Sequence, residues 1–212
     1  MGYSLELRHT GCQMLMEYWA RMLANGSVPP HAKIQPRALK SILPMVFTLN
    51  MTHAGEARFG LAGTQLCTQF GQELGGKPFF ATWEATSVNV AKPLLYLSHE
   101  TLVPIKFELL AMSENLQFVD VEIILAPLAV DATGFMRFIG AMHIANKRPL
   151  LYSGTMLSQR LTATQLAQKG TASHARRTKL ANQSRHNDGS MLVRAYNNVL
   201  KPCLRNRCAS AV

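Results

Sequence analysis

The chain has 212 residues, 48% of them hydrophobic, which is enough for one domain with an appended segment or for two very small domains. No apolar stretch approaches the roughly 20 residues that cross a bilayer as a helix, and the N-terminus lacks the pattern of a signal peptide. The formal net charge is +10, but residues 1–147 are neutral, with eleven basic and eleven acidic residues. Residues 148–212 hold eleven Lys and Arg against one acid, so the whole excess, 11 − 1 = +10, lies there.

Cysteine usage indicates a reducing compartment. Cys12 and Cys67 fall on apolar helix faces, which favours reduced core residues over a disulfide. We therefore expect a cytoplasmic protein. The seven histidines show no spacing typical of metal ligands, so we predict no metal site, and the motifs leave any cofactor unknown.

The pattern of apolar residues predicts helices and strands in a definite order. The predicted helices lie at residues 10–24, 37–43 and 83–99, with Thr10 as the cap of the first and a kink or break at Pro93 in the last. The predicted strands lie at residues 45–51, 56–62, 102–112, 117–125 and 135–145. This order predicts an α+β fold, with a five-stranded antiparallel sheet, helices on one face and an N-terminal helix.

Residues 58–76 combine a short strand, a short helix and two glycine turns. Gly63 frees the backbone for a sharp bend after the strand, and Thr64 then caps a helix that Gly71 ends. So compact an element is typical of a sensor-like fold and differs from the long crossover helix of a doubly wound enzyme.

The apolar pattern weakens after residue 150. Residues 158–168 predict one weak helix, and residues 169–190 are too polar and basic to bury enough surface to order themselves. We therefore expect a folded domain over residues 1–150 and a basic, largely disordered tail over residues 151–212. The tail either stays solvated or contacts a polyanion, and its candidate contact residues are Arg176, Arg177, Lys179 and Arg185.

Short motifs accompany the predicted elements. They are R-F-x-L-A-G-T at 58–64, F-G-x-E-L-x-G at 70–76, Trp83, Glu122, A-P-L at 126–128 and Gly140. Together with the order of elements, they resemble the bacterial single-domain PAS family of alphaproteobacteria over residues 9–150. The resemblance implies an antiparallel sheet cupped around short helices, used for sensing or for protein contacts. The chain departs from the family pattern at His31, Lys33 and Gln35, where an arginine and acidic residues are usual.

A PAS-like cup implies a pocket between the sheet and the helices over residues 63–98. The candidate pocket residues are Phe59, Leu61, Thr64, Phe70, Trp83, Phe107 and His143. Aromatic residues at these positions would serve a packed core equally well. No catalytic constellation is present, and the near match to a phosphate-binding loop at residues 71–77 is followed by Pro78 instead of Ser or Thr.

We therefore predict a non-enzymatic, PAS-like sensory or protein-interaction module in bacterial signalling, with a small apolar or aromatic molecule as its possible ligand and an unknown protein partner. The alternative is a regulator that binds nucleic acid or an anionic membrane through its basic tail.

Two further features of the sequence leave alternatives open. The stripe of Met14, Tyr18 and Met22 lies beside a second apolar stripe on the first helix, so one stripe either supports a homodimer or packs on the sheet of its own chain. Arg58 and Glu122 are opposite charges in apolar strands. They either face solvent separately or form a partly buried pair.

Overall fold

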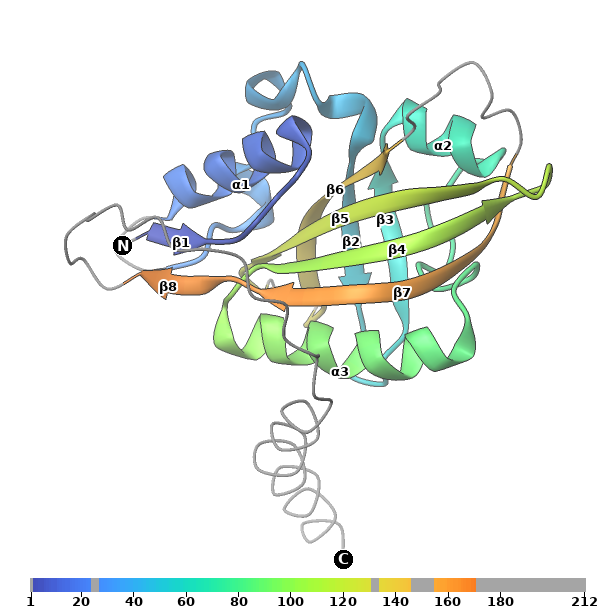
Figure 1. Ribbon diagram of the computed structural model, residues 1–212. Coiled ribbons are helices and arrows are strands. Elements are labelled where there is room, and N and C mark those ends of the chain that lie inside the picture. The colour runs from blue at the N-terminus through green and yellow to red at the C-terminus, as the bar shows by residue number, and fades with distance from the viewer. Residues whose placement is uncertain (1, 24–26, 131–133, 146–154, 171–212) are drawn as a thin grey trace, which may run out of the picture. The chain divides into compact units, whose positions relative to one another are not determined.

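The computed structural model describes residues 2–23, 27–130, 134–145 and 155–170, which belong to a compact unit spanning Met1–Ala172 (Figure 1). No helix within these ranges is both long enough and apolar enough to span a membrane. The expected polyanion contacts fall outside the described residues. They are Arg176, Arg177, Lys179 and Arg185.

A six-stranded antiparallel sheet lies at the centre of the unit, in the order β3-β2-β6-β5-β4-β7. Its strands are β2 (Val46–Met51), β3 (Ala57–Ala62), β4 (Ile105–Ser113), β5 (Phe118–Leu128), β6 (Met136–Ala145) and β7 (Met156–Leu166). The first five confirm the strands expected from the sequence, and with them the α+β class. Two short strands, β1 (Gly2–Ser4) and β8 (Gln168–Gly170), form a separate antiparallel pair.

Strand β7 corrects the expectation of a weak helix over residues 158–168. It pairs with β4 along its whole length, from Leu166 opposite Ile105 to Met156 opposite Ser113. An edge strand needs few large apolar residues because only part of it is buried, so pairing with the open side of β4 overrides a weak helical pattern. The compact unit consequently extends past the boundary expected at residue 150.

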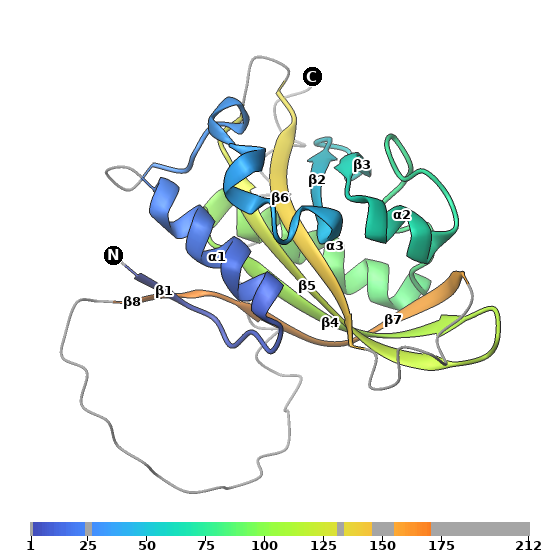
Figure 2. The ribbon, with the colours of Figure 1, turned by 90° about the horizontal axis from the view of Figure 1, so that it is seen from above.

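The helices cover both faces of the sheet, and not one face alone. They are α1 (Thr10–Met22), α2 (Thr64–Phe70) and α3 (Ala85–Thr101), and Figure 2 shows α1 and α3 on opposite sides of the strands. Ile123 and Leu125 belong to the cluster that α2 and α3 cover, whereas Ile124 belongs to the cluster that α1 covers. Since β5 is buried on both faces from Val121 onward, the sheet needs a cover on each side.

Local details of the helices also differ from expectation. The N-cap of α1 is His9 in place of Thr10, and its Nδ1 accepts a hydrogen bond of 3.0 Å from the Gly11 amide. Helix α2 begins after Gly63 without a side-chain cap, and it ends at Gly71 in the left-handed region (φ 62°), as a glycine stop should. Helix α3 runs through Pro93.

Three short 3-10 helices replace the single helix expected over residues 37–43. They are η1 (His31–Lys33), η2 (Pro36–Leu39) and η3 (Leu43–Met45). Pro36 and Pro44 each lie at the start of one of them, where the missing amide proton is not needed. The prolines thus divide the segment into single turns that lie beside the N-terminal end of β2.

Candidate functional site

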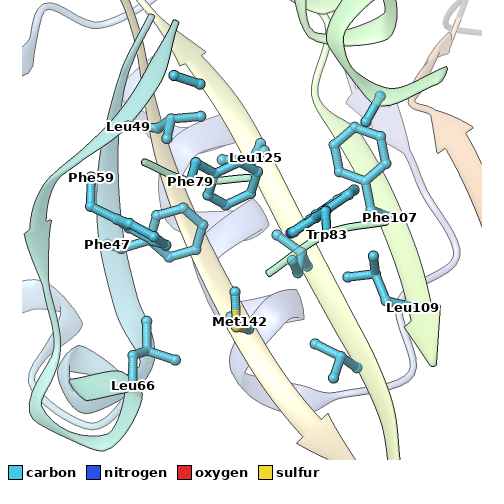
Figure 3. Packing of buried hydrophobic residues seen from close by; sticks show 14 of the residues in the cluster. Phe47, Leu49, Phe59, Leu66, Phe79, Trp83, Phe107, Leu109, Leu125 and Met142 are labelled. Atoms are coloured by element: carbon cyan, nitrogen blue, oxygen red, sulfur yellow. The ribbon is translucent and has the colours of Figure 1, made fainter. Parts of the chain in front are cut away.

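A chain of touching aromatic rings fills the space between the sheet and helices α2 and α3 (Figure 3). The ring centroids of Phe59 and Phe79 are 5.3 Å apart, those of Phe79 and Trp83 are 5.5 Å apart, and those of Trp83 and Phe107 are 5.7 Å apart. Such edge-on and tilted contacts between aromatic rings stabilise a core beyond simple area burial. Four of the candidate pocket residues lie buried in this aromatic cluster: Phe59, Phe70, Trp83 and Phe107.

Polar atoms of Trp83 and Gln159 lie beside this apolar interior. The indole Nε1 of Trp83 is buried and has no hydrogen-bond partner among the described residues. Nearby, Gln159 of β7 forms a parallel bridge with Trp83 and donates from Nε2 to Thr82 Oγ1 at 2.6 Å, while its Oε1 also lacks a described partner. A buried indole normally finds an acceptor, so a hydrogen-bonding ligand atom would be stabilised beside Trp83 Nε1.

The structure separates Leu61 from the aromatic cluster by a β-bulge. Phe47 pairs with Ala62 and Leu49 with Phe59, which leaves one extra residue on β3. The Leu61 amide donates to Thr48 Oγ1 at 2.8 Å, and the Leu61 side chain is 70% exposed. Sequence reasoning placed Leu61 with Phe59 because a regular strand keeps alternate residues on one face.

Leu61 and Thr64 instead line an apolar groove of about 560 Å³ on the outside of the unit, which we call the outer groove. Buried residues of three segments contribute to it: Leu39 of η2, Phe47 of β2 and Ile139 of β6. Leu43, which is 41% exposed, also lines it.

Gly63 sets the position of the outer groove's wall between β3 and α2. Its amide donates to the Val46 carbonyl at 2.8 Å, and a Cβ at residue 63 would overlap the carbonyl oxygens of Leu43 and Pro44. Only glycine therefore allows the backbone of residue 63 to lie this close to η3. The sequence signal for this contact was the glycine itself, which we assigned to a bend alone.

The last candidate pocket residue, His143, lies on the other face of the sheet. It follows Ile139 and Ala141, which pack in the cluster under α1. Its ring stacks on that of His9, with centroids 3.1 Å apart and planes 13° apart. Burial and the neighbouring His9 lower the pKa of His143 to about 4, against a smaller opposite effect of Glu122. The pair borders a cavity of about 150 Å³.

Glu122 and Arg58 do not pair with each other. Glu122 is 6% exposed and accepts from the backbone amides of Arg8, at 2.8 Å, and His9, at 3.1 Å. Arg58 instead donates to Glu56 at 2.9 Å and to the Gly76 carbonyl at 3.0 Å. The position of an acid directly before the apolar run of residues 123–128 in β5 was the signal for Glu122. Its role is to hold the chain at the start of α1.

The apolar stripes of α1 pack mainly on the sheet of their own chain. Leu15 and Trp19 are fully buried, and Trp19 Nε1 donates to the Pro127 carbonyl at 2.8 Å. Tyr18, from the stripe considered for a homodimer, is buried as well, and its hydroxyl accepts from the Gln35 amide at 2.7 Å. Met14 of the same stripe is 37% exposed.

These observations define an α+β protein with an antiparallel sheet covered on both faces, an aromatic interior and an apolar groove outside. The family model of the PAS domain matches residues 7–143, which is more than half of the chain. The protein belongs to the PAS domain family, and this membership supports a sensory or interaction module. Strands β7 and β8 lie beyond the matched residues. A comparison with curated proteins finds no match.

Proposed function

We propose that this protein is a non-enzymatic PAS module of bacterial signalling that acts through contacts with a partner protein. The observation that carries this proposal is the outer groove, where Leu43 and Leu61 remain exposed at 41% and 70% although the aromatic residues of the interior are packed against one another. Contiguous exposed apolar surface in a groove is typical of sites that bind another protein or a ligand.

The proposal is tested by chemical crosslinking of the full-length protein in the cells that make it, followed by identification of the crosslinked peptides. We expect a reproducible protein partner whose crosslinks map to the matched PAS region. A chain that yields no crosslinked partner, and that carries a stoichiometric small molecule instead, would contradict it.

Sensing of a small apolar or aromatic ligand is the second candidate function. The observation in its favour is the buried Trp83 Nε1, which lacks a described acceptor within the aromatic cluster. Native mass spectrometry of the purified chain would detect a retained ligand. Trp83→Phe removes the donor and keeps an apolar ring, so it should reduce ligand retention without loss of the fold.

Polyanion binding through the basic tail is the third candidate. It is favoured by the net charge of residues 148–212, eleven bases less one acid, 11 − 1 = +10. Binding to random duplex DNA or to anionic vesicles should weaken steeply as salt rises. The reason is that binding releases counterions from the polyanion, and this release is less favourable when the salt concentration is high. Replacing Arg176, Arg177, Lys179 and Arg185 by Gln should reduce both the affinity and its salt dependence. Equal binding by the wild-type protein and by the Gln variant would contradict a role of these residues in polyanion binding.

A further inference from the structure

The segments that form the outer groove carry basic residues and no acidic ones. Between Glu17 and Glu56 the chain contains no Asp or Glu, although Lys33, Arg37 and Lys40 occur there. All three cations are exposed, and within the described part of the chain none of them forms an ion pair. Lys40 and His31 themselves line the groove. The groove is therefore an apolar surface lined by Lys40, and the segments that line it carry two further exposed cations, Lys33 and Arg37.

The exposure of Leu61 is built into the backbone. The bulge in β3 turns this side chain out of the aromatic cluster, and the hydrogen bond from the Leu61 amide to Thr48 Oγ1 holds the bulge. A regular strand would have directed the same residue into the core together with Phe59. A local departure from pairing that exposes a large apolar side chain is expected where that side chain meets another molecule.

From this arrangement we infer that the outer groove receives an apolar segment of a partner protein that carries acidic residues beside its apolar side chains, an inference that rests on the proposed function. The apolar side chains would contact Ile34, Leu43 and Leu61, which line the groove and are at least partly exposed. The acidic groups would face Lys40 at the groove, and Lys33 and Arg37 on the same segments. Complementary charges around an apolar centre raise the association rate and exclude partners of the wrong sign.

The same charges disfavour two other occupants. The C-terminal segment of this chain has ten net positive charges over residues 148–212 (eleven bases less one acid) and would be repelled. A symmetric contact between two copies would place Lys33, Arg37 and Lys40 of each copy near the groove of the other, which brings like charges together. An acidic segment from a different protein is the occupant that the charges favour.

The test uses the full-length protein and a fluorescent synthetic peptide with central leucines flanked by glutamates. Fluorescence anisotropy should show binding of this peptide, and a peptide with lysines in place of the glutamates should not bind. Leu61→Asp should weaken binding by about tenfold or more, as expected for loss of an apolar anchor. Lys40→Glu should weaken it by about two- to fivefold at low salt, and the difference should shrink as salt screens the charges.

A matched control for each variant is present in the chain. Leu116 is 72% exposed in the turn between β4 and β5, so Leu116→Asp makes the same change away from the groove. Lys77→Glu is the control for charge, because Lys77 is exposed and does not line the groove. Circular dichroism should show an unchanged fold for all four variants, since each replaces an exposed residue.

Three results would overturn the inference: no binding of the glutamate peptide, equal weakening by Leu61→Asp and Leu116→Asp, or a dimer in light scattering that Leu61→Asp dissociates. The last result would assign the groove to a second copy. The two proposals also fail separately. If a crosslinked partner is captured equally well by the Leu61→Asp variant, the protein is an interaction module but the outer groove is not its binding site. If the peptide binds in the groove but cells contain no crosslinked partner, the proposed interaction module is contradicted.

Discussion

At the scale of single residues, the stacked rings of His9 and His143 link the stability of the fold to pH. The folded state lowers the pKa of His143 to about 4, below the ordinary value of 6.5, because the ring is partly desolvated and lies against His9. The folded state therefore favours the neutral ring. This contribution to stability is fully present above pH 6.5 and is lost as the pH falls towards 4.

We expect the free energy of unfolding, measured by urea denaturation, to decrease between pH 6.5 and pH 4. His143→Gln, which has no titrating group, should make this decrease smaller. His53→Gln is the control, because His53 is an exposed histidine in the turn before β3. Identical pH profiles for wild type and His143→Gln would show that the stacked pair does not contribute.

Glu122 provides a second prediction at the scale of residues. Glu122→Ala leaves the Arg8 and His9 amides without the acceptor that now orients the start of α1. Loss of one partner of partly buried hydrogen bonds costs about 2 kcal/mol, so the midpoint of urea denaturation should fall clearly. Glu17→Ala, on the exposed side of α1, should change stability by less than about 0.5 kcal/mol. Similar losses in both variants would argue against this role for Glu122.

At the scale of elements, α1 has one exposed position in a stripe that is otherwise packed. Tyr18→Phe removes the hydroxyl that accepts from the Gln35 amide and should destabilise the fold by about 1 kcal/mol. Met14→Glu should leave stability nearly unchanged, because Met14 is 37% exposed. Thermal denaturation distinguishes the two. If Met14→Glu also converts a dimer into a folded monomer in light scattering, the homodimer proposed for α1 is supported through Met14 alone.

The elements that the sequence predicted well are those with a strong internal pattern. Strands β2 to β6 alternate or run apolar over enough residues to be recognised, and α1 has a clear apolar face. The prediction of a weak helix over residues 158–168 was wrong, because this polar sequence becomes strand β7 only through pairing with β4, a partner about 50 residues earlier. The cover on both faces was also missed, although the continuous apolar run of residues 123–128 in β5 contained the information.

The candidate pocket residues depended on which face of the sheet each side chain occupies. Phe59 and Phe107 were assigned to one interior, and they share one cluster. The side of the sheet that Leu61 faces could not be predicted, because a bulge turns its side chain to the opposite face. The side that His143 faces could not be predicted either, because apolar residues lie on both faces of β6. The alternation of side chains along a strand predicts which residues share a face of the sheet, but it does not predict which helix covers that face.

At the scale of the whole molecule, the position of β7 determines where the chain can be shortened. A chain that ends at residue 151 lacks β7 and β8, exposes the edge of β4 and removes the buried Met156 and Gln159. We expect this fragment to aggregate or to melt far below the full-length protein. A chain that ends at residue 172 retains the complete sheet and should melt cooperatively within about 3 °C of the full-length protein, a difference of about 1 kcal/mol.

Circular dichroism melts of the two fragments, with gel filtration to detect aggregates, provide the measurement. Equal melting temperatures for both fragments would mean that β7 contributes little beyond the matched PAS region. A large loss in the longer fragment would instead mean that residues after 172 stabilise the sheet.

The position of β6 between β2 and β5 also determines the order in which a growing chain can assemble. The hairpins of β2 with β3 and of β4 with β5 leave the ribosome first, and β6, which pairs with both, follows only at Met136–Ala145. In the interval, Phe47 and Leu49 lie on a strand with one unpaired side. Closure then joins residues about 90 positions apart, which is slow compared with local pairing. We therefore expect the nascent protein to present two apolar hairpins with open edges, the kind of surface that chaperones bind and shield until the central strand is made.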